Sequence, residues 1–287
     1  MIVAIYRFAI RLRFAAMKFR FLAVEKLETF MIRIKNEKQI EGIRRSCHLL
    51  ADMFNEVIPQ VKAGMSTKDI DDLCKNFITS HGGKPAWYRE DFPGAACVSV
   101  NEEVIHGIPS KKKIIRDGDL VSIDVGIDLG GYISDSTHTV LVGNVRPEWK
   151  KLDDVTRECL EAGIQACKAG NRISDITKAV YEIAHKKHGY GVVYEYCGHG
   201  VGLDVHEDPT IPNSPKGRDS NPRIQPGMVL AIEPMINLGV DEVELLDNEW
   251  TVVTEDGLCS AHEEHTVAVF PDHTEILTAL DWRTSAL

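Results

Sequence analysis

The chain has 287 residues and a mass of 32.0 kDa, enough for one large hydrophobic core or two smaller ones. Its 44% hydrophobic and 26% charged residues are ordinary for a globular protein and exclude disordered, collagen-like and coiled-coil chains. The net charge of −10 argues against nucleic-acid binding as the main function. A chain with this net charge can still carry a local basic patch.

Two further features bear on the compartment. The seven cysteines are scattered and include no Cys-x-x-Cys pair, so we expect reduced thiols that pack inside a cytoplasmic protein. No apolar run reaches the roughly 18 to 20 residues that a membrane helix needs, so we expect no membrane span.

Residues 1–30 differ in composition from the rest of the chain. Residues 1–24 contain four arginines and one lysine but no acidic residue, glycine or proline. The arginines interrupt every apolar window long enough for an export signal, and the absence of serine before Ser46 is atypical of a transit peptide. Either these residues form a basic N-terminal extension or translation begins at Met31, and we favour the second interpretation.

Two helices are predicted at the start of the regular sequence. Apolar residues recur at helical spacing over residues 36–57, and Pro59 ends this helix. The next helix is predicted to begin after Ser66, a typical N-cap residue, and to end at His81-Gly82-Gly83.

Short sequences of this helix pair recur later in the chain. The matches are Lys62-Ala63-Gly64 with Lys168-Ala169-Gly170, Asp69-Ile70 with Asp175-Ile176, and His81-Gly82 with His188-Gly189. Each copy follows a predicted helix, the second of them over residues 153–169, and precedes strand-rich sequence. We therefore predict an internally duplicated α+β fold with pseudo-twofold symmetry and a site between its halves, with chance similarity as the alternative.

Residues 120–142 alternate between apolar and polar side chains around a glycine-rich turn, which predicts a β-hairpin. With Leu129 and Gly130 as the turn residues, Asp124 faces Asp135. Two opposed carboxylates repel each other unless a cation lies between them, so a divalent metal ion is the simplest explanation. The alternative is that one aspartate is protonated or directed to solvent.

Three later segments place polar groups in apolar surroundings. His199 lies between two glycines in the segment 197–202, and Glu233 and Glu264 each interrupt an apolar, strand-like run. A carboxylate in such a strand is costly unless it is paired or bound to metal. We therefore predict one metal site made of Asp124, Asp135, His199, Glu233 and Glu264.

This ligand set indicates the metal and the chemistry. Hard carboxylate oxygens with a single imidazole suit Mn, Fe, Co or Zn, and carboxylates that are able to bridge suit two ions ~3.5 to 4 Å apart. Such a pair activates water for hydrolysis. A Mg-dependent phosphoryl-transfer site is disfavoured because the chain has no glycine-rich phosphate loop.

Taken in order, these segments resemble type I methionine aminopeptidases. The resemblance runs from about Met31 to Phe270 and rests on Asn101–Pro109, the Asp124/Asp135 hairpin, Cys197–Gly202, His206–Pro209, Ile232–Met235 and Glu264–Thr266. It implies the pita-bread fold and removal of the initiator methionine from new proteins whose second residue is small. We expect the catalytic domain to cover residues 31–275 and a C-terminal tail to cover residues 276–287.

The resemblance also implies roles for single residues. It assigns one ion to Asp124, Asp135 and Glu264, and the other to Asp135, His199, Glu233 and Glu264. His106 would lie over the scissile amide, His206 would donate to the carbonyl oxygen, and Glu233 would shuttle a proton from the bridging water. The histidines that match no such role are interpreted as surface or packing residues: His138, His185, His188, His262 and His265.

In this family, aromatic residues, a cysteine and a tryptophan line the methionine pocket, which implies Cys97 and Trp250 here. The segment 87–93 differs in length and charge from the family pattern, and we select Tyr88 and Phe92 as its lining residues. Val205 replaces a larger apolar or aromatic residue, which predicts a wider pocket.

The expected partners are peptides and nascent chains that begin with methionine, cleaved by a monomeric cytoplasmic enzyme near the ribosome. Some family members dock on the ribosome through a basic loop before the tryptophan, but residues 240–249 are acidic here. We therefore expect no RNA docking by that route, although residues 111–113 form another small basic patch.

Two other functions stay open. A proline-directed peptidase of the same fold shares the metal ligands, but it usually carries a sizeable N-terminal domain and the segment 101–109 favours the methionine enzyme. A non-enzymatic binding protein of this fold would have lost its ligands, whereas all five are present here.

Overall fold

The computed structural model describes residues 31–217 and 221–281, and it separates residues 1–31 from a unit formed by residues 32–287. The predicted N-terminal extension, residues 1–30, lies outside the described residues. Within the described ranges, no helix is both long enough and apolar enough to cross a membrane.

The helices follow the predicted pattern with shifted ends. The α-helices are α2 (Glu37–Val57), α3 (Thr67–Ser80), α4 (Pro147–Ala166) and α5 (Ile173–Tyr181), with helical turns at Ile58–Gln60, Ala86–Glu90 and Glu182–Lys187. Ser66 caps α3 as predicted, since its side chain accepts a hydrogen bond from the N–H of Asp69. Helix α4 begins before the predicted residue 153 because proline is favoured in the first helical turn, and it ends before residue 169.

The strands pair into several small sheets. They are β1 (Lys84–Pro85), β2 (Cys97–Val100), β3 (Glu103–Ile105), β4 (Leu120–Leu129), β5 (Tyr132–Leu141), β6 (Gly191–Val192), β7 (Gly198–Gly200), β8 (Glu207–Ile211), β9 (Val229–Ile232), β10 (Met235–Asn237), β11 (Val243–Leu245), β12 (Val252–Thr254), β13 (Ser260–His262), β14 (His265–Val269) and β15 (Thr274–Ile276). Their orders are β1-β4-β2 with β5 beside β4, β13-β10-β6, β11-β12-β3, and β15-β14-β9-β7-β8.

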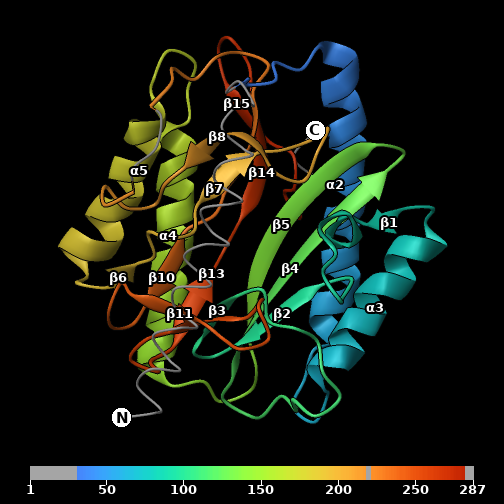
Figure 1. Ribbon diagram of the computed structural model, residues 1–287, viewed down its shortest axis with the longest axis vertical. Coiled ribbons are helices and arrows are strands. Elements are labelled where there is room, and N and C mark those ends of the chain that lie inside the picture. The colour runs from blue at the N-terminus through green and yellow to red at the C-terminus, as the bar shows by residue number, and fades with distance from the viewer. Residues whose placement is uncertain (1–30, 218–220, 282–287) are drawn as a thin grey trace, which may run out of the picture. The chain divides into compact units, whose positions relative to one another are not determined.

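Each helix pair packs on its own group of strands, as Figure 1 shows. Helices α2 and α3 cover β2, β4 and β5, and α4 lies against β9, β10 and β13. The two groups meet where β5 runs beside β14. There the Thr266 hydroxyl donates to the Asp135 carbonyl (2.7 Å), and the Glu264 N–H donates to the Thr137 carbonyl (3.0 Å). The junction between the halves therefore carries two of the predicted metal ligands.

The duplication is visible in matching backbone details. Gly64 and Gly170 have φ of +92° and +94°, a left-handed conformation that favours glycine. Each donates its N–H to a carbonyl at 2.9 Å, Gly64 to Ile115 and Gly170 to Ile224. The equivalent turns support the predicted internal repeat.

The hairpin β4–β5 has a different register from the prediction. Gly130 and Gly131 form the turn, with φ of 65° and 91°. This type of turn requires a positive φ at both central residues, which glycine adopts easily and leucine does not. Asp135 therefore pairs with Gly126, and Asp124 pairs with Thr137, so the predicted direct pairing of the two aspartates is wrong. Residues two apart share a face of the sheet, so the two carboxylates are diagonal neighbours on one face.

The predicted C-terminal boundary falls inside a strand. Residue 276 ends β15, which pairs with β14, and Leu277 beyond it is fully buried. The Thr278 hydroxyl accepts a hydrogen bond from the N–H of Thr266 (3.1 Å). The packed fold thus continues past the predicted start of the tail.

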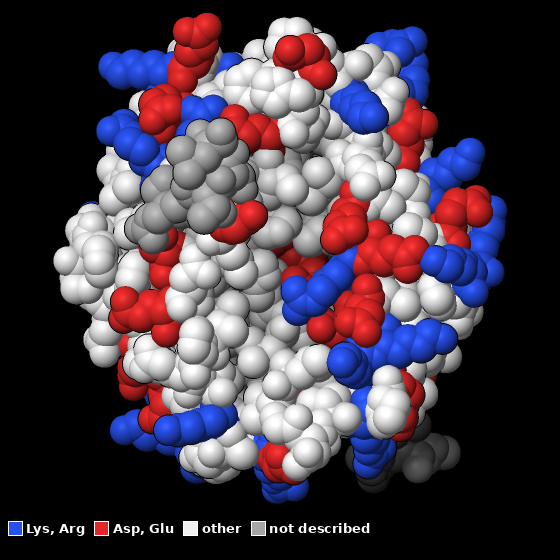
Figure 2. All heavy atoms as spheres, turned by 180° about the vertical axis from the view of Figure 1, so that it is seen from behind, with Lys and Arg blue, Asp and Glu red and all other residues white. Residues whose placement is uncertain are grey.

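The surface and the thiols agree with the composition. Acidic and basic side chains are interspersed over the face drawn in Figure 2. Six of the seven cysteines are buried free thiols.

Candidate metal centre and active site

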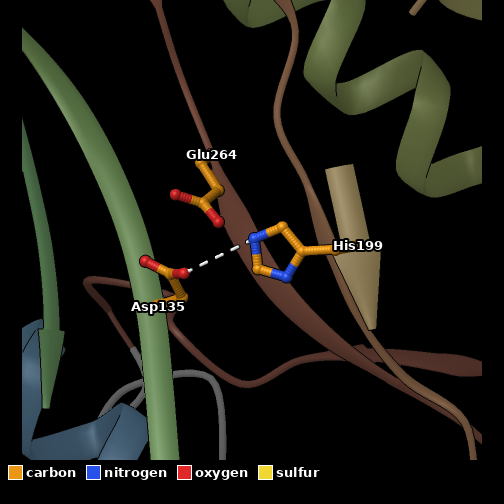
Figure 3. Close-up of side chains that lie close together, drawn as sticks. All are labelled: Asp135, His199 and Glu264. Atoms are coloured by element: carbon orange, nitrogen blue, oxygen red, sulfur yellow. Dashed lines mark ion pairs between the residues drawn. The ribbon is translucent and has the colours of Figure 1, made fainter. Parts of the chain in front are cut away.

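Three side chains from different strands converge in the interior. Asp135 comes from β5, His199 from β7 and Glu264 from the residue before β14, and their ligand atoms all lie within 4.8 Å of one another. Figure 3 shows the three groups pointing toward a common point, with Nε2 of His199 3.7 Å from Oδ2 of Asp135. All three residues are buried.

The backbone around His199 explains the glycines on both sides of it. A Cβ on Gly198 would lie 2.4 Å from the Ala231 carbonyl oxygen, and one on Gly200 would lie 2.3 Å from that of Asp208. Nδ1 of His199 lies 2.9 Å from the Gly200 carbonyl oxygen, so it carries the proton and donates it there. Burial lowers the pKa of His199 to about 3, which leaves a neutral ring with the Nε2 lone pair facing the carboxylates.

The other two predicted ligands lie beside this cluster but outside it. Oε1 of Glu233, the residue after β9, is 3.4 Å from Nε2 of His199. Burial raises the pKa of Glu233 to about 8, and burial also raises that of Asp124 to about 7. The Thr137 hydroxyl and the Cys97 thiol limit the rise in the pKa of Asp124.

Three of these carboxylates each have a buried oxygen without the hydrogen-bond partner that a buried charge needs. Oδ1 of Asp124, Oδ1 of Asp135 and Oε1 of Glu264 are buried without a hydrogen-bond partner among the described residues. Burial and mutual repulsion raise the pKa of Asp135 and of Glu264 well above the ordinary range. Unpartnered hard oxygens beside an imidazole lone pair are the donor set that a divalent transition metal prefers. These residues therefore fit a metal ion.

Two more predicted histidines lie near this centre. His206 is 51% exposed in its side chain, and its ring centroid is 4.5 Å from that of His199. His106 has a φ of 56°, a left-handed conformation that is strained for this residue type, and burial lowers its pKa to about 4. Strain of this kind concentrates at functional sites.

Comparisons with known proteins agree with this geometry. The profile of metallopeptidase family M24 matches residues 41–270. The chain belongs to metallopeptidase family M24. It is 60% identical over 248 residues to the methionine aminopeptidase of Treponema pallidum, an alignment that covers 86% of this chain and 96% of that protein.

Solved structures extend the likeness to the fold. The methionine aminopeptidase from Rickettsia prowazekii is 38% identical with a TM-score of 0.83, and the alignment covers 87% of this chain and 100% of that one. Prolidase from Pyrococcus furiosus is 25% identical with a TM-score of 0.69, and only 65% of its chain is covered. The predicted family and the pita-bread α+β fold are confirmed. Family membership and the buried cluster together support the predicted use of a divalent metal.

Apolar residues gather beside the metal centre of this metallopeptidase. Phe92, Cys97, Val205 and Trp250 belong to one hydrophobic cluster, in which the rings of Phe92 and Trp250 meet edge to face at 5.2 Å. Tyr88 is 46% exposed and stands outside the cluster, so its position does not support the predicted lining role. Its neighbour Trp87 is buried there instead and donates its indole N–H to the Asp124 carbonyl (3.2 Å).

His262, which we interpreted from the sequence as a surface or packing residue, lies beside the predicted ligand Glu233 in this metallopeptidase. It is 2% exposed, and its Nε2 lies 3.3 Å from Oε2 of Glu233. The only sequence signal is its place two residues before Glu264, in a His-Glu-Glu-His run. A single sequence gave no reason to separate it from His265, which contacts Thr278 instead (2.9 Å).

Proposed function

We propose that this chain is a methionine aminopeptidase that removes N-terminal methionine from peptides and new proteins with a small second residue. The observation that carries the proposal is a buried carboxylate–imidazole cluster beside an aromatic apolar cluster. The chain also matches curated methionine aminopeptidases over nearly their whole length, as the relative from Treponema pallidum illustrates at 96%.

For the metals, we propose two ions drawn from Co, Mn, Fe or Zn. Asp124 would hold the first and His199 with Glu233 the second, while Asp135 and Glu264 would bridge them. The unpartnered oxygens of Asp124, Asp135 and Glu264 support this assignment. When bound, such ions act as Lewis acids toward the scissile carbonyl and lower the pKa of water.

The protein side chains supply proton transfer and orientation. Glu233 accepts the proton of the attacking water and passes it to the leaving amine as the peptide C–N bond breaks. His206 donates to the carbonyl oxygen as negative charge develops, and His106 orients the amide.

Substrate choice follows from the pocket and the space beyond it. We propose that Phe92, Cys97, Val205 and Trp250 hold the methionine thioether, with Trp87 behind them. A bulky second residue would displace the scissile carbonyl, and a misplacement of ~1 Å can cost ~10²-fold in rate. The small Val205 side chain should make the pocket tolerant of norleucine and, to a smaller extent, leucine.

The test is a panel of peptides with the purified apoprotein and each metal in turn. Met-Ala-Ser should be cleaved with at least one metal, whereas Gly-Pro should not. In a Met-X series, kcat/KM should fall steeply from Ala and Gly to Leu and Lys. Cleavage of Gly-Pro in preference to Met-Ala-Ser would favour the prolidase function, and no cleavage with metal bound would favour a binding protein.

We further propose that the enzyme acts as a monomer in the cytoplasm on nascent chains. Six buried free thiols and substrates that begin with the initiator residue support that compartment. Sedimentation of the purified protein tests the monomer, and co-sedimentation with translating ribosomes tests the proximity to nascent chains.

A further inference from the structure

Glu233 has a different imidazole beside each of its two carboxylate oxygens. Oε1 lies 3.4 Å from Nε2 of His199, and Oε2 lies 3.3 Å from Nε2 of His262. His199 presents a lone pair at this atom, because its Nδ1 donates to a backbone carbonyl. The two oxygens therefore face two nitrogens that need not have the same role.

The position of His262 is set by backbone contacts. Strand β13 runs antiparallel to β10 with His262 opposite Met235, two residues after Glu233. The Thr139 hydroxyl donates to the His262 carbonyl (2.8 Å) and accepts from the His262 N–H (3.3 Å). The ring is thereby held against Glu233 by two neighbouring strands.

Nε2 of His262 is a buried polar atom without a hydrogen-bond partner among the described residues. Glu233 Oε2 is close enough, but the present angle is not that of a hydrogen bond. Hydrogen bonds in active sites are often misaligned before ligands bind and tighten in the complex. A small rotation of the Glu233 carboxylate would satisfy this nitrogen.

His262 is not part of the compact group of candidate ligand atoms. The ligand atoms within 4.8 Å of one another belong to Asp135, His199 and Glu264, and neither Glu233 nor His262 is among them. Each Glu233 oxygen instead lies 3.3 to 3.4 Å from one imidazole nitrogen. Groups that hold a metal ligand from behind fix its orientation, and their loss typically costs about 10- to 100-fold in metal affinity or activity.

We propose that His262 is a positioning residue for Glu233, with an N–H on Nε2 that holds Oε2 and keeps Oε1 directed at the metal centre. The proposal rests on the proposed function and deepens it. Without this contact the Glu233 carboxylate is free to rotate, so binding of the methionine side chain is kept while proton transfer is slowed.

The experiment compares His262→Leu, His262→Gln and the matched control His265→Gln, all loaded with Co²⁺. Glutamine keeps an N–H donor near Oε2, whereas leucine fills similar space without one. For His262→Leu we expect kcat on Met-Ala-Ser to fall about 10- to 100-fold with KM nearly unchanged, weaker Co²⁺ binding and a shifted Co²⁺ visible absorption spectrum. His262→Gln should recover most of the activity and the wild-type spectrum, and His265→Gln should change neither.

Several results would overturn the proposal. If His262→Leu kept the wild-type kcat and the wild-type Co²⁺ spectrum, His262 would not position Glu233. Loss of one bound Co²⁺ in both His262 variants would make His262 a ligand. An equal loss of kcat in His262→Leu and His262→Gln would show that His262 acts by packing alone and not through an N–H donor. A wild-type protein that binds Co²⁺ but leaves Met-Ala-Ser intact would refute the proposed function alone, because metal affinity and the spectrum would still test the contact.

Discussion

Glu263 and Glu264 are neighbours in the chain and are both buried, yet their carboxylates lie in opposite environments. Glu263 accepts hydrogen bonds from the Thr139 N–H (3.0 Å) and pairs with Arg157 (2.6 Å) and His138 (3.3 Å). Glu264 accepts one hydrogen bond, from the Thr137 hydroxyl (3.0 Å), and its Oε1 has no partner among the described residues.

The charged neighbours of Glu263 lower its pKa, whereas those of Glu264 raise its pKa. Burial raises the pKa of Glu263 to about 7, and the Arg157 guanidinium and the Thr139 N–H limit that rise. Around Glu264, by contrast, Asp135, Glu233 and Asp124 add to the effect of burial. A compensated buried carboxylate supports the fold, whereas an uncompensated one marks a place where a cation is needed.

The largest effect is expected from Glu264→Ala. Loss of a bridging ligand removes several kcal/mol of transition-state stabilisation, so activity should fall by about 10³-fold or more. Metal analysis by mass spectrometry should find fewer ions bound per chain. Retention of two ions and full activity would show that Glu264 is not a ligand.

Glu263→Ala should affect folding more than catalysis. It leaves the buried Thr139 N–H without its acceptor, a loss of about 1 to 3 kcal/mol, whereas Arg157 is 43% exposed and keeps Asp153 as a partner. Urea unfolding of the apoprotein measures this loss, and the same measurement on Glu264→Ala should show no loss, because that change relieves repulsion. Equal destabilisation by the two variants would remove the distinction between them.

The sequence already contained the polar interruptions of apolar strands, and therefore the candidate ligands at Glu233 and Glu264. It did not show that Glu263 pairs with Arg157, because that contact depends on how α4 packs against the strands. The hairpin was predicted, but its register depends on which two turn residues adopt positive φ.

The sequence also did not predict which side chains point inward in the divergent segment after α3. The helical turn Ala86–Glu90 buries Trp87 and exposes Tyr88, and a single sequence with a changed segment length does not fix that rotation. His262 was missed because its role depends on strand pairing with β10 and on no motif of its own.

The uncompensated carboxylates should make the apoprotein less stable as the pH rises. The folded-state pKa values of Asp124 and Glu233, about 7 and about 8, lie above the ordinary values of 3.8 and 4.5. The folded state therefore binds more protons between these limits, and stability present at acidic pH is lost as the pH rises through about 8. Each group contributes roughly 1.4 kcal/mol per pH unit in its window.

Chemical unfolding of the apoprotein from about pH 7 to about pH 8.5 checks this slope. Below that range the buried histidines, whose pKa values are lowered by burial, act with the opposite sign. The metal-loaded protein is the control, because metal binding strengthens as carboxylates deprotonate, so its stability should not fall over the same range. A flat or rising curve for the apoprotein would contradict the raised pKa values.

The smallest effect concerns the single hydrogen bond that Glu264 receives. Thr137→Val keeps the shape of the side chain and removes the hydroxyl that donates to Oε2 of Glu264. Glu264 then loses part of its orientation, and metal affinity should fall by about tenfold, at the lower end of the range for groups that support a metal ligand. Competition with a chelator measures the affinity. Thr156→Val is the matched control, since its buried hydroxyl donates to the Leu152 carbonyl inside α4 (2.9 Å) and should leave affinity unchanged. Equal affinities in the two variants would mean that Glu264 is oriented by the metal and the strand alone.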